Sequence, residues 1–252
     1  MKKLMFVAAV AAGMVAFGDA IESQNVVGYQ AHSLPTESSS VFNMGVSFLN
    51  PATVDGSYVV STNLFGNELA KGDVVYKVDV DYWDFNGYTY NGYKSGVFNG
   101  WGVLYADGDS GKVNSFSVAP GEGIYFEPGD TDQTPVISGE VAASGTQTVE
   151  FDTDDAATFQ LVNPFPVATT FADLETFVAK GDVVYVVDVD YWDFTGYTYN
   201  GYKSGVYNGW TALYADGDSG KIMDNTQVIL PAGKSGFLEP GGSCEWNVTL
   251  NY

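Results

Sequence analysis

The fold is decided by residues 70–112, which read AKGDVVYKVDVDYWDFNGYTYNGYKSGVFNGWGVLYADGDSGK. Residues 179–221 read AKGDVVYVVDVDYWDFTGYTYNGYKSGVYNGWTALYADGDSGK, so the two stretches are identical at 38 of 43 positions, at a constant offset of 109. A weaker match extends outwards on both sides, and residues 120–129 correspond to residues 231–241. Self-similarity at a fixed spacing indicates that the chain carries the same structural unit twice.

Strand and turn signals are dense within the repeat. Apolar and polar side chains alternate from Tyr76 to Trp83, which is the two-residue period of a β-strand. Asn-Gly pairs, which are typical of hairpin turns, follow at Asn86, Asn91 and Asn99. The sequence therefore predicts an all-β fold of two tandem antiparallel β-sandwich-like modules, with at most a short helical turn in each.

The sequence has one clear helix signal. Thr170 and Asp173 have the spacing of a capping box and precede an apolar stretch. A single helical turn is therefore expected at residues 170–177.

The chain divides into a leader and two modules. Two lysines precede an apolar run and then small residues, which is the order of a secretory signal peptide, so residues 1–20 are predicted to be one. Module one is expected to span residues 21–142 and module two residues 143–252. The small residues of 142–145 are the expected linker between them.

The composition is acidic and contains no arginine. Ten lysines oppose 31 acidic residues, and the formal net charge is −21. Such a surface repels nucleic acid and anionic membranes, so nucleic acid is not an expected partner. Because no second long apolar stretch exists, the mature chain is not expected to insert into a membrane. We expect a secreted, periplasmic or cell-surface location.

The single cysteine, Cys244, and the single histidine, His32, limit the covalent and metal chemistry. One cysteine cannot form an internal disulfide. It is either a small buried apolar residue or a cross-link between two chains. One cysteine and one histidine do not supply the ligands of a zinc site.

The aromatic cluster of the repeat is a candidate carbohydrate-binding surface. Such a surface needs rings that stack on sugar faces, next to amides and carboxylates that bind sugar hydroxyls. The candidate rings are Trp83, Tyr88, Tyr90 and Trp101 in module one and Trp192, Tyr197, Tyr199 and Trp210 in module two. The alternative is that both faces of each sheet are covered and that these rings form the cores.

The Asp-Gly-Asp segments of the repeat are a candidate calcium site. The carboxylates at the first and third positions of such a loop are Asp107 and Asp109 in module one and Asp216 and Asp218 in module two. The match is partial, because Gly and Lys follow at positions five and six, where a carboxylate and a glycine are needed. A β-turn explains the same residues without a metal. Calcium is therefore the one candidate cofactor.

Two patterns resemble enzyme motifs, and neither is complete. Gly-Asp-Ser-Gly at 108–111 and 217–220 is similar to the nucleophile motif of chymotrypsin-like proteases, but a serine nucleophile needs a base and one histidine cannot serve two sites. Asp79 and Asp81 share one strand face at about 6.8 Å, a separation that suits glycoside hydrolysis. Acidic pairs are also common on exposed strands. We expect no catalytic activity, with a glycoside hydrolase as the remaining alternative.

Four motifs resemble the modules of uncharacterised secreted all-β tandem-module proteins of Gram-negative bacteria. They are Asn-Pro-Phe at 163–165, Gly-Asp-Val-Val-Tyr at 72–76, Gly-Trp at 100–101 and Pro-Gly-Glu-Gly at 120–123. Module two departs from the last motif, with Ala-Gly-Lys at 232–234. The resemblance covers nearly the whole mature chain and implies secretion and a β fold.

These features together predict a secreted, non-catalytic surface, structural or extracellular interaction protein with two near-identical modules. Its expected partners are an extracellular glycan or copies of itself. The alternative is a bivalent carbohydrate-binding protein that uses exposed Trp and Tyr side chains and depends on calcium, because two equal sites raise avidity toward a repetitive target.

Overall fold

The computed structural model of the 252-residue chain describes residues 27–31, 41–49, 53, 58–59, 64–65, 69–79, 84–103, 111–113, 115–129, 136–141, 145–154, 157–188, 193–213, 220 and 222–250. Within these ranges the strand pairs are all antiparallel. The predicted all-β class is confirmed. The predicted signal peptide, residues 1–20, lies outside the described residues.

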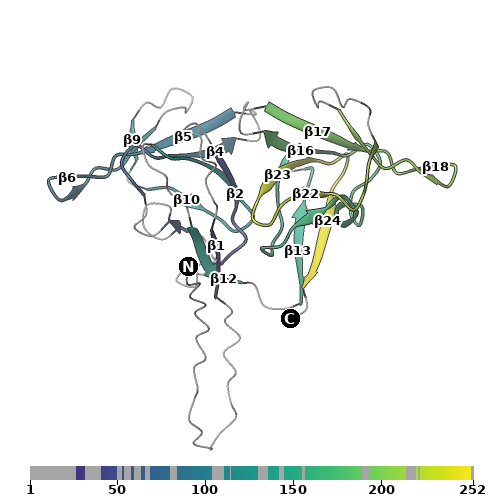
Figure 1. The fold of residues 1–252 in the computed structure, drawn as a ribbon, viewed down its shortest axis with the longest axis horizontal. Coiled ribbons are helices and arrows are strands. Elements are labelled where there is room, and N and C mark those ends of the chain that lie inside the picture. Colours follow the sequence, from purple (N-terminus) through teal and green to yellow (C-terminus); the bar gives the residue numbers. More distant parts are fainter. Residues whose placement is uncertain are drawn as a thin grey trace, which may run out of the picture.

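Two six-stranded sheets form the centre of the molecule, and their strand orders are equivalent (Figure 1). The first sheet has the order β2 (Phe42–Gly45), β11 (Gly123–Glu127), β4 (Val74–Asp79), β5 (Asp84–Tyr90), β8 (Trp101–Val103) and β9 (Lys112–Val113). The second has the order β14 (Phe159–Val162), β23 (Ser235–Glu239), β16 (Val183–Asp188), β17 (Asp193–Tyr199), β20 (Trp210–Ala212) and β21 (Ile222–Met223). The two copies of the repeat therefore fold with the same topology.

Short two-stranded ribbons surround these sheets. In the first half they pair β1 (Val27–Ala31) with β12 (Val136–Glu140), β3 (Tyr58–Val59) with β10 (Ser117–Val118), and β6 (Tyr93–Lys94) with β7 (Val97–Phe98). In the second half they pair β13 (Gly145–Phe151) with β24 (Cys244–Leu250), β15 (Thr169–Thr170) with β22 (Val228–Leu230), and β18 (Tyr202–Lys203) with β19 (Val206–Tyr207). The predicted module boundary at residue 142 falls between β12 and β13 and stays a prediction.

The helical turn lies where the sequence predicts it. The helix α1 (Phe171–Leu174) begins after Thr170, whose hydroxyl accepts the N–H of Asp173 at 3.3 Å. The Asp173 carboxylate in turn accepts the N–H of Thr170 at 2.7 Å. This reciprocal pair satisfies two of the free N–H groups that every helix start leaves, so the predicted capping box is confirmed.

The hairpin turns differ from the prediction. Asn86-Gly87 lies inside β5, and Gly87 pairs with Tyr76 of β4. Asn91-Gly92 faces Asn99-Gly100 across one hairpin, and the reversal itself is at Ser95-Gly96. Gly92 and Gly100 have φ of +63° and +74°, so these Asn-Gly pairs supply left-handed backbone beside a hairpin rather than at its tip.

Each half has its own aromatic core. In the first half Trp101 packs against Tyr90 with 5.1 Å between ring centroids. In the second half Trp210 packs against Tyr199 at the same distance, 5.1 Å. Buried aromatic rings contribute more apolar area than any other side chain, so these pairs are central to the stability of each half.

The Gly-Asp pair at the start of each repeat ties two loops together. Asp73 is fully buried and accepts the N–H groups of Ala70 at 2.7 Å and of Gly129 at 2.9 Å. Asp182 makes the two equivalent hydrogen bonds, each at 2.8 Å, in the second half. In the first half the carboxylate therefore joins the start of β4 to the Pro-Gly segment after β11. In the second half it joins the start of β16 to the Pro-Gly segment after β23, so the Gly-Asp motif has the same structural role in both copies.

Asp182→Asn is expected to lower the free energy of unfolding by about 1–2 kcal/mol, because an amide keeps one acceptor and buries an NH2 group opposite a backbone donor. Urea denaturation followed by tryptophan fluorescence measures the change. Asp173→Asn, at an exposed helix cap, is the control and should change stability less. Equal losses in the two variants would contradict a buried tie at Asp182.

The two sheets meet along β2 and β11 of the first half and β14 and β23 of the second. A third apolar cluster fills this joint, and Val41, Tyr125, Val187 and Phe237 are buried in it. Tyr125 and Phe237 are equivalent positions of the two copies. The joint therefore resembles the isologous interface of a two-fold dimer, built within one chain.

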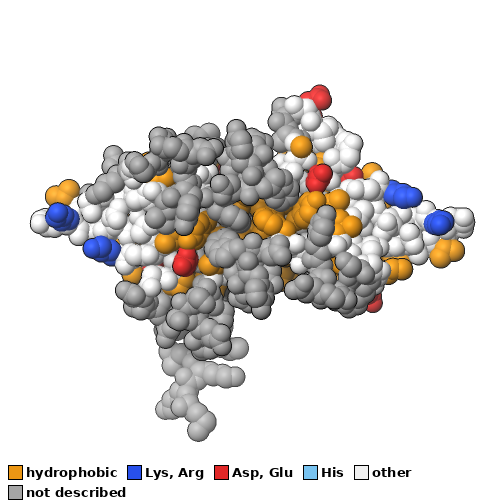
Figure 2. Space-filling model, turned by 90° about the horizontal axis from the view of Figure 1, so that it is seen from above, with side chains coloured by type: hydrophobic (Ala, Val, Ile, Leu, Met, Phe, Trp, Pro, Cys, Tyr) orange, Lys and Arg blue, Asp and Glu red, His pale blue; other side chains and the backbone are white. Residues whose placement is uncertain are grey.

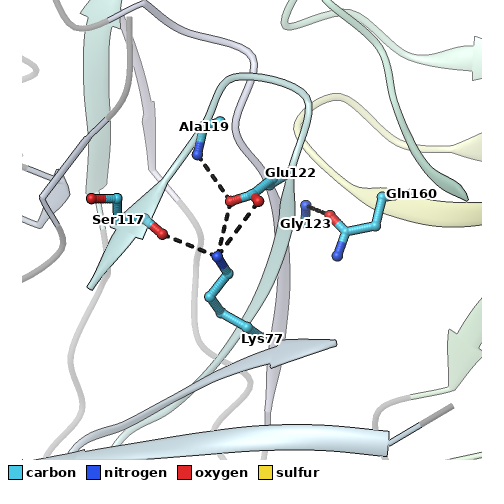
Figure 3. Close-up of polar contacts among 6 residues, drawn as sticks. All are labelled: Lys77, Ser117, Ala119, Glu122, Gly123 and Gln160. Carbon is cyan, nitrogen blue, oxygen red and sulfur yellow. Dashed lines mark hydrogen bonds and ion pairs between the residues drawn. The ribbon is translucent and has the colours of Figure 1, made fainter. Parts of the chain in front are cut away.

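The polar contacts of the joint follow the same symmetry. Asn43 donates its amide to the carbonyl of Ser235 at 2.7 Å and accepts the hydroxyl of Ser235 at 2.6 Å. In the opposite sense, Gln160 accepts the N–H of Gly123, as Figure 3 shows. Asn43 and Gln160 stand at equivalent register positions of β2 and β14, so each half reaches across to the other from the same place.

Charged side chains break this symmetry beside the joint. In the first half Lys77 pairs with Glu122 at 3.2 Å (Figure 3). The corresponding positions of the second half are Val186 and Lys234. Lys234 instead crosses the joint and donates to the carbonyl of Asn43 at 2.8 Å, and burial lowers its pKa. The two halves are thus alike in topology and different in charge where they meet.

Candidate functional site

Four of the predicted carbohydrate-binding rings lie in the cores. Trp101 and Trp210 are 0% exposed, and Tyr90 and Tyr199 are 9% and 8% exposed. A sugar cannot stack on a ring without an accessible face. The carbohydrate interpretation is therefore wrong for these four residues, and the packing alternative describes them.

The two predicted rings at the next positions are partly buried. Tyr88 stacks on Phe116 with 4.1 Å between centroids, and burial raises its pKa. Tyr197 meets Phe171 edge to face at 5.2 Å. Two further predicted rings lie outside the described residues: Trp83 and Trp192. Of the six predicted rings that the structure describes, four are buried in the cores and do not form an exposed surface.

The predicted calcium ligands, Asp107, Asp109, Asp216 and Asp218, also lie outside the described residues. Within the described ranges, no three His, Cys, Asp or Glu side chains come close enough to hold a metal ion. Calcium at the Asp-Gly-Asp segments therefore stays a prediction. The same holds for the glycoside hydrolase alternative, since Asp81 is outside these ranges as well.

The most prominent surface feature is a hairpin that projects from each half. We define arm one as residues 91–100 and arm two as residues 200–209; their tips are the ribbons β6–β7 and β18–β19. Figure 1 places β6 and β18 at opposite ends of the molecule. The two arms differ in sequence at one position, Phe98 against Tyr207. The molecule therefore presents nearly the same element twice.

Each arm is held by backbone hydrogen bonds that continue the core hairpin. In arm one, Asn91 donates to the carbonyl of Gly100 at 3.1 Å and Asn99 donates to that of Gly92 at 2.8 Å. The tip is a two-residue turn in which Ser95 and Gly96 have φ of +53° and +79°. Two positive φ values are the signature of the type I′ turn, whose twist matches that of the strands. The tip is therefore a defined structure rather than an open loop.

The tips expose large apolar side chains. Tyr93 and Val97 of arm one are 68% and 70% exposed, and Tyr202 and Val206 of arm two are 64% and 69% exposed. These values are the highest among the large apolar residues that the structure describes. Clustered exposed apolar groups are typical of interaction surfaces, so the tips are the candidate functional site.

The exposed lysines of the described chain lie on the arms or beside their bases. Among the described residues, the exposed lysines are Lys71, Lys94, Lys180 and Lys203. Lys94 and Lys203 are at the tips, and a Cβ added at Gly92 or Gly201 would lie 3.5 or 3.7 Å from the Cβ of Lys71 or Lys180. Figure 2 shows lysines beside hydrophobic side chains at both ends of the molecule. In a chain of net charge −21, this separates cationic ends from an acidic body.

Sequence reasoning missed the arms because it treated each Asn-Gly pair as a turn. The available signal was the segment Tyr-Lys-Ser-Gly-Val, at 93–97 and 202–206, between two Asn-Gly pairs. A lysine interrupts the apolar residues around the Ser-Gly reversal, so the segment has no continuous apolar face to bury, which favours a hairpin that projects from the sheet.

No protein-family model, curated protein or solved structure matches the chain. In the part of the chain that the structure describes, no helix has the length and apolar character needed to cross a membrane.

Proposed function

We propose that the protein is a secreted, non-catalytic surface or interaction protein that makes its contacts through the two arms. The observation that carries this proposal is the same exposed apolar and cationic tip at both ends of one molecule. A surface that serves only for solubility would carry acidic or polar side chains there, as a net charge of −21 provides elsewhere.

The joint between the halves supports a bridging role. Its buried aromatic and amide contacts hold the two sheets together, so the arms keep a fixed separation and direction. When one of two sites on a rigid body has bound a repetitive partner, the second site meets the next repeat at a high effective concentration. The overall affinity is therefore higher than that of a single site. The arms therefore act together as a bivalent element.

The chemistry of the tips indicates the kind of partner. Lysine beside exposed Tyr and Val fits an acidic surface that also offers apolar groups. A second copy of this chain supplies such a surface, and tips at opposite ends would join copies into an open array. The exposed rings of Tyr93 and Tyr202 also suit an acidic saccharide, which is the second candidate partner.

The test is sedimentation velocity of residues 21–252 over a range of protein concentrations, with wild type and arm variants. The one-arm variant is Tyr93→Ser with Lys94→Glu, and the two-arm variant adds Tyr202→Ser with Lys203→Glu. Wild type should form species larger than a dimer that dissociate as salt screens the charges. The one-arm variant should stop at small assemblies, and the two-arm variant should be monomeric.

Ile222→Ser is the matched control, because Ile222 is a 59% exposed apolar residue outside the arms. It should associate as the wild type does. An arm-dependent signal on immobilised acidic glycans, from a protein that stays monomeric, would favour the saccharide partner instead. A two-arm variant that retains every interaction of the wild type would refute the proposal.

A further inference from the structure

The second half contains a hollow of about 390 Å³ between α1, β16, β17, β21 and β22. Six of its nine described lining residues are apolar, among them Phe171, Val186, Met223 and Val228. Ligand sites in proteins typically occupy about 300–1,000 Å³ and are lined mainly by apolar and aromatic side chains. The hollow is independent of the arms and is not used by the bridging role.

Three uncharged polar side chains complete the lining. They are Tyr197, which was one of the predicted binding rings, together with Thr195 and Gln227. No Asp, Glu or Lys is among the described residues that line the hollow, in a chain whose net charge is −21. A charged ligand would lose its hydration there without a compensating partner, so the lining selects a neutral one.

The first half provides an internal comparison at the described positions where the two copies differ. Gln227 is the residue directly before β22, and Phe116 is the residue directly before the corresponding strand β10 of the first half. The Phe116 ring stacks on Tyr88, the counterpart of Tyr197, at 4.1 Å. At this position the second half carries an amide, which lines the hollow, instead of a ring.

A second replacement enlarges the difference. Val186 stands where the first half has Lys77. The Lys77 ammonium crosses to β10 and donates to the carbonyl of Ser117 at 3.0 Å, as Figure 3 shows. The short Val186 side chain does not reach the equivalent residue, Val228, in this way, and both valines line the hollow. Two positions at which the copies differ, Val186 and Gln227, therefore both line the hollow.

We propose that this hollow is a binding site for a neutral, mainly apolar small molecule that carries a flat ring and one or two hydrogen-bonding groups. The apolar walls hold the ring, and Tyr197, Thr195 and Gln227 supply donors and acceptors at its edge. The proposed site is the hollow of the second half, whose lining residues the structure describes.

Indole is the probe, because it is neutral, flat and apolar and has a single N–H donor. Its binding to residues 21–252 is measured by saturation-transfer NMR and calorimetry, with an expected stoichiometry of one. Gln227→Phe places the ring of the first half into the hollow and should weaken binding about tenfold or more, since pockets discriminate by that much for even small groups. The melting temperature of the Gln227→Phe variant should stay at or above that of the wild type. Weaker binding would then be due to the filled hollow and not to unfolding.

Val186→Lys, the other substitution that the first half carries, should also weaken indole binding. Val206→Ala, on the tip of arm two, should leave it unchanged. The converse variant, Phe116→Gln, should create a second site and raise the stoichiometry toward two. A wild-type protein that does not bind indole, or a Gln227→Phe variant that binds it equally well, overturns the proposal and leaves the role of the arms untouched.

Discussion

Trp210→Ala is expected to lower the free energy of unfolding by about 3–5 kcal/mol, the range for removing a large buried aromatic side chain. Trp210 is 0% exposed and packs against Tyr199 and Phe171 with centroid distances of 5.1 and 5.2 Å. Its removal leaves a cavity at the centre of the second core. The surrounding strands are held in place by their hydrogen bonds, so they cannot move inwards to fill the cavity. Urea denaturation monitored by far-UV circular dichroism measures the loss.

Trp210→Phe is the matched control, and it should cost less than half as much. The indole nitrogen of Trp210 has no hydrogen-bond partner among the residues that the structure describes, so phenylalanine removes a buried polar group along with part of the ring. Tyr202→Ser, on an exposed tip, should change stability by about 0.5 kcal/mol or less. A Trp210→Ala protein of wild-type stability that had lost saccharide binding would restore the carbohydrate interpretation of this ring.

The aromatic cluster shows how far sequence periodicity reaches. Alternation predicted a strand from Tyr76 to Trp83, which is confirmed as far as Asp79, where β4 ends. It also assigned neighbouring residues to opposite faces. It did not show that a second layer covers the outer face: Val75 packs in the first core, whereas Tyr76 and Val78 pack in the joint. When both faces of a sheet are covered, alternating residues are buried on two different faces. The alternation then does not separate buried residues from exposed ones.

The joint between the halves lies beyond what a sequence pattern can predict. The amide of Asn43 meets Ser235 across 192 residues of chain, and neither residue stands out by type or spacing. The repeat identified two units of equal topology, but not that they pack as a pseudo-symmetric pair. By contrast, the Thr170–Asp173 capping box involves neighbours in sequence, and local chemistry predicted it correctly.

The arms and the hollow differ in the sequence signal by which each could have been predicted. The arms are nearly identical in the two copies, so comparing the copies gives no signal, and exposure is known only from the structure. The hollow is lined at two positions where the copies differ, Gln227 against Phe116 and Val186 against Lys77. In a protein with an internal repeat, the positions that differ are therefore the sequence signal to follow when looking for a site that belongs to one copy.

Gly123→Val is expected to lower the free energy of unfolding by about 3–4 kcal/mol and to loosen the joint. A Cβ at Gly123 would lie 2.2 Å from the hydroxyl oxygen and 2.5 Å from the Cβ of Ser235. Overpacking of this kind costs about 1–3 kcal/mol, and displacing Ser235 also breaks its hydrogen bonds with Asn43, at about 1 kcal/mol each. Differential scanning calorimetry should show two separate transitions where the wild type shows one, since the halves lose their shared apolar cluster.

Gly242→Val is the control, because a Cβ at Gly242 meets nothing within 4 Å. Adding Ser235→Gly to Gly123→Val removes the group that clashes and should recover part of the stability, so the two changes are non-additive, as expected of residues in contact. A Gly123→Val protein that melts in one transition at the wild-type temperature would mean that the packing of Gly123 against Ser235 does not hold the halves together. The fixed separation of the arms, on which bivalent bridging rests, would then lose its structural basis.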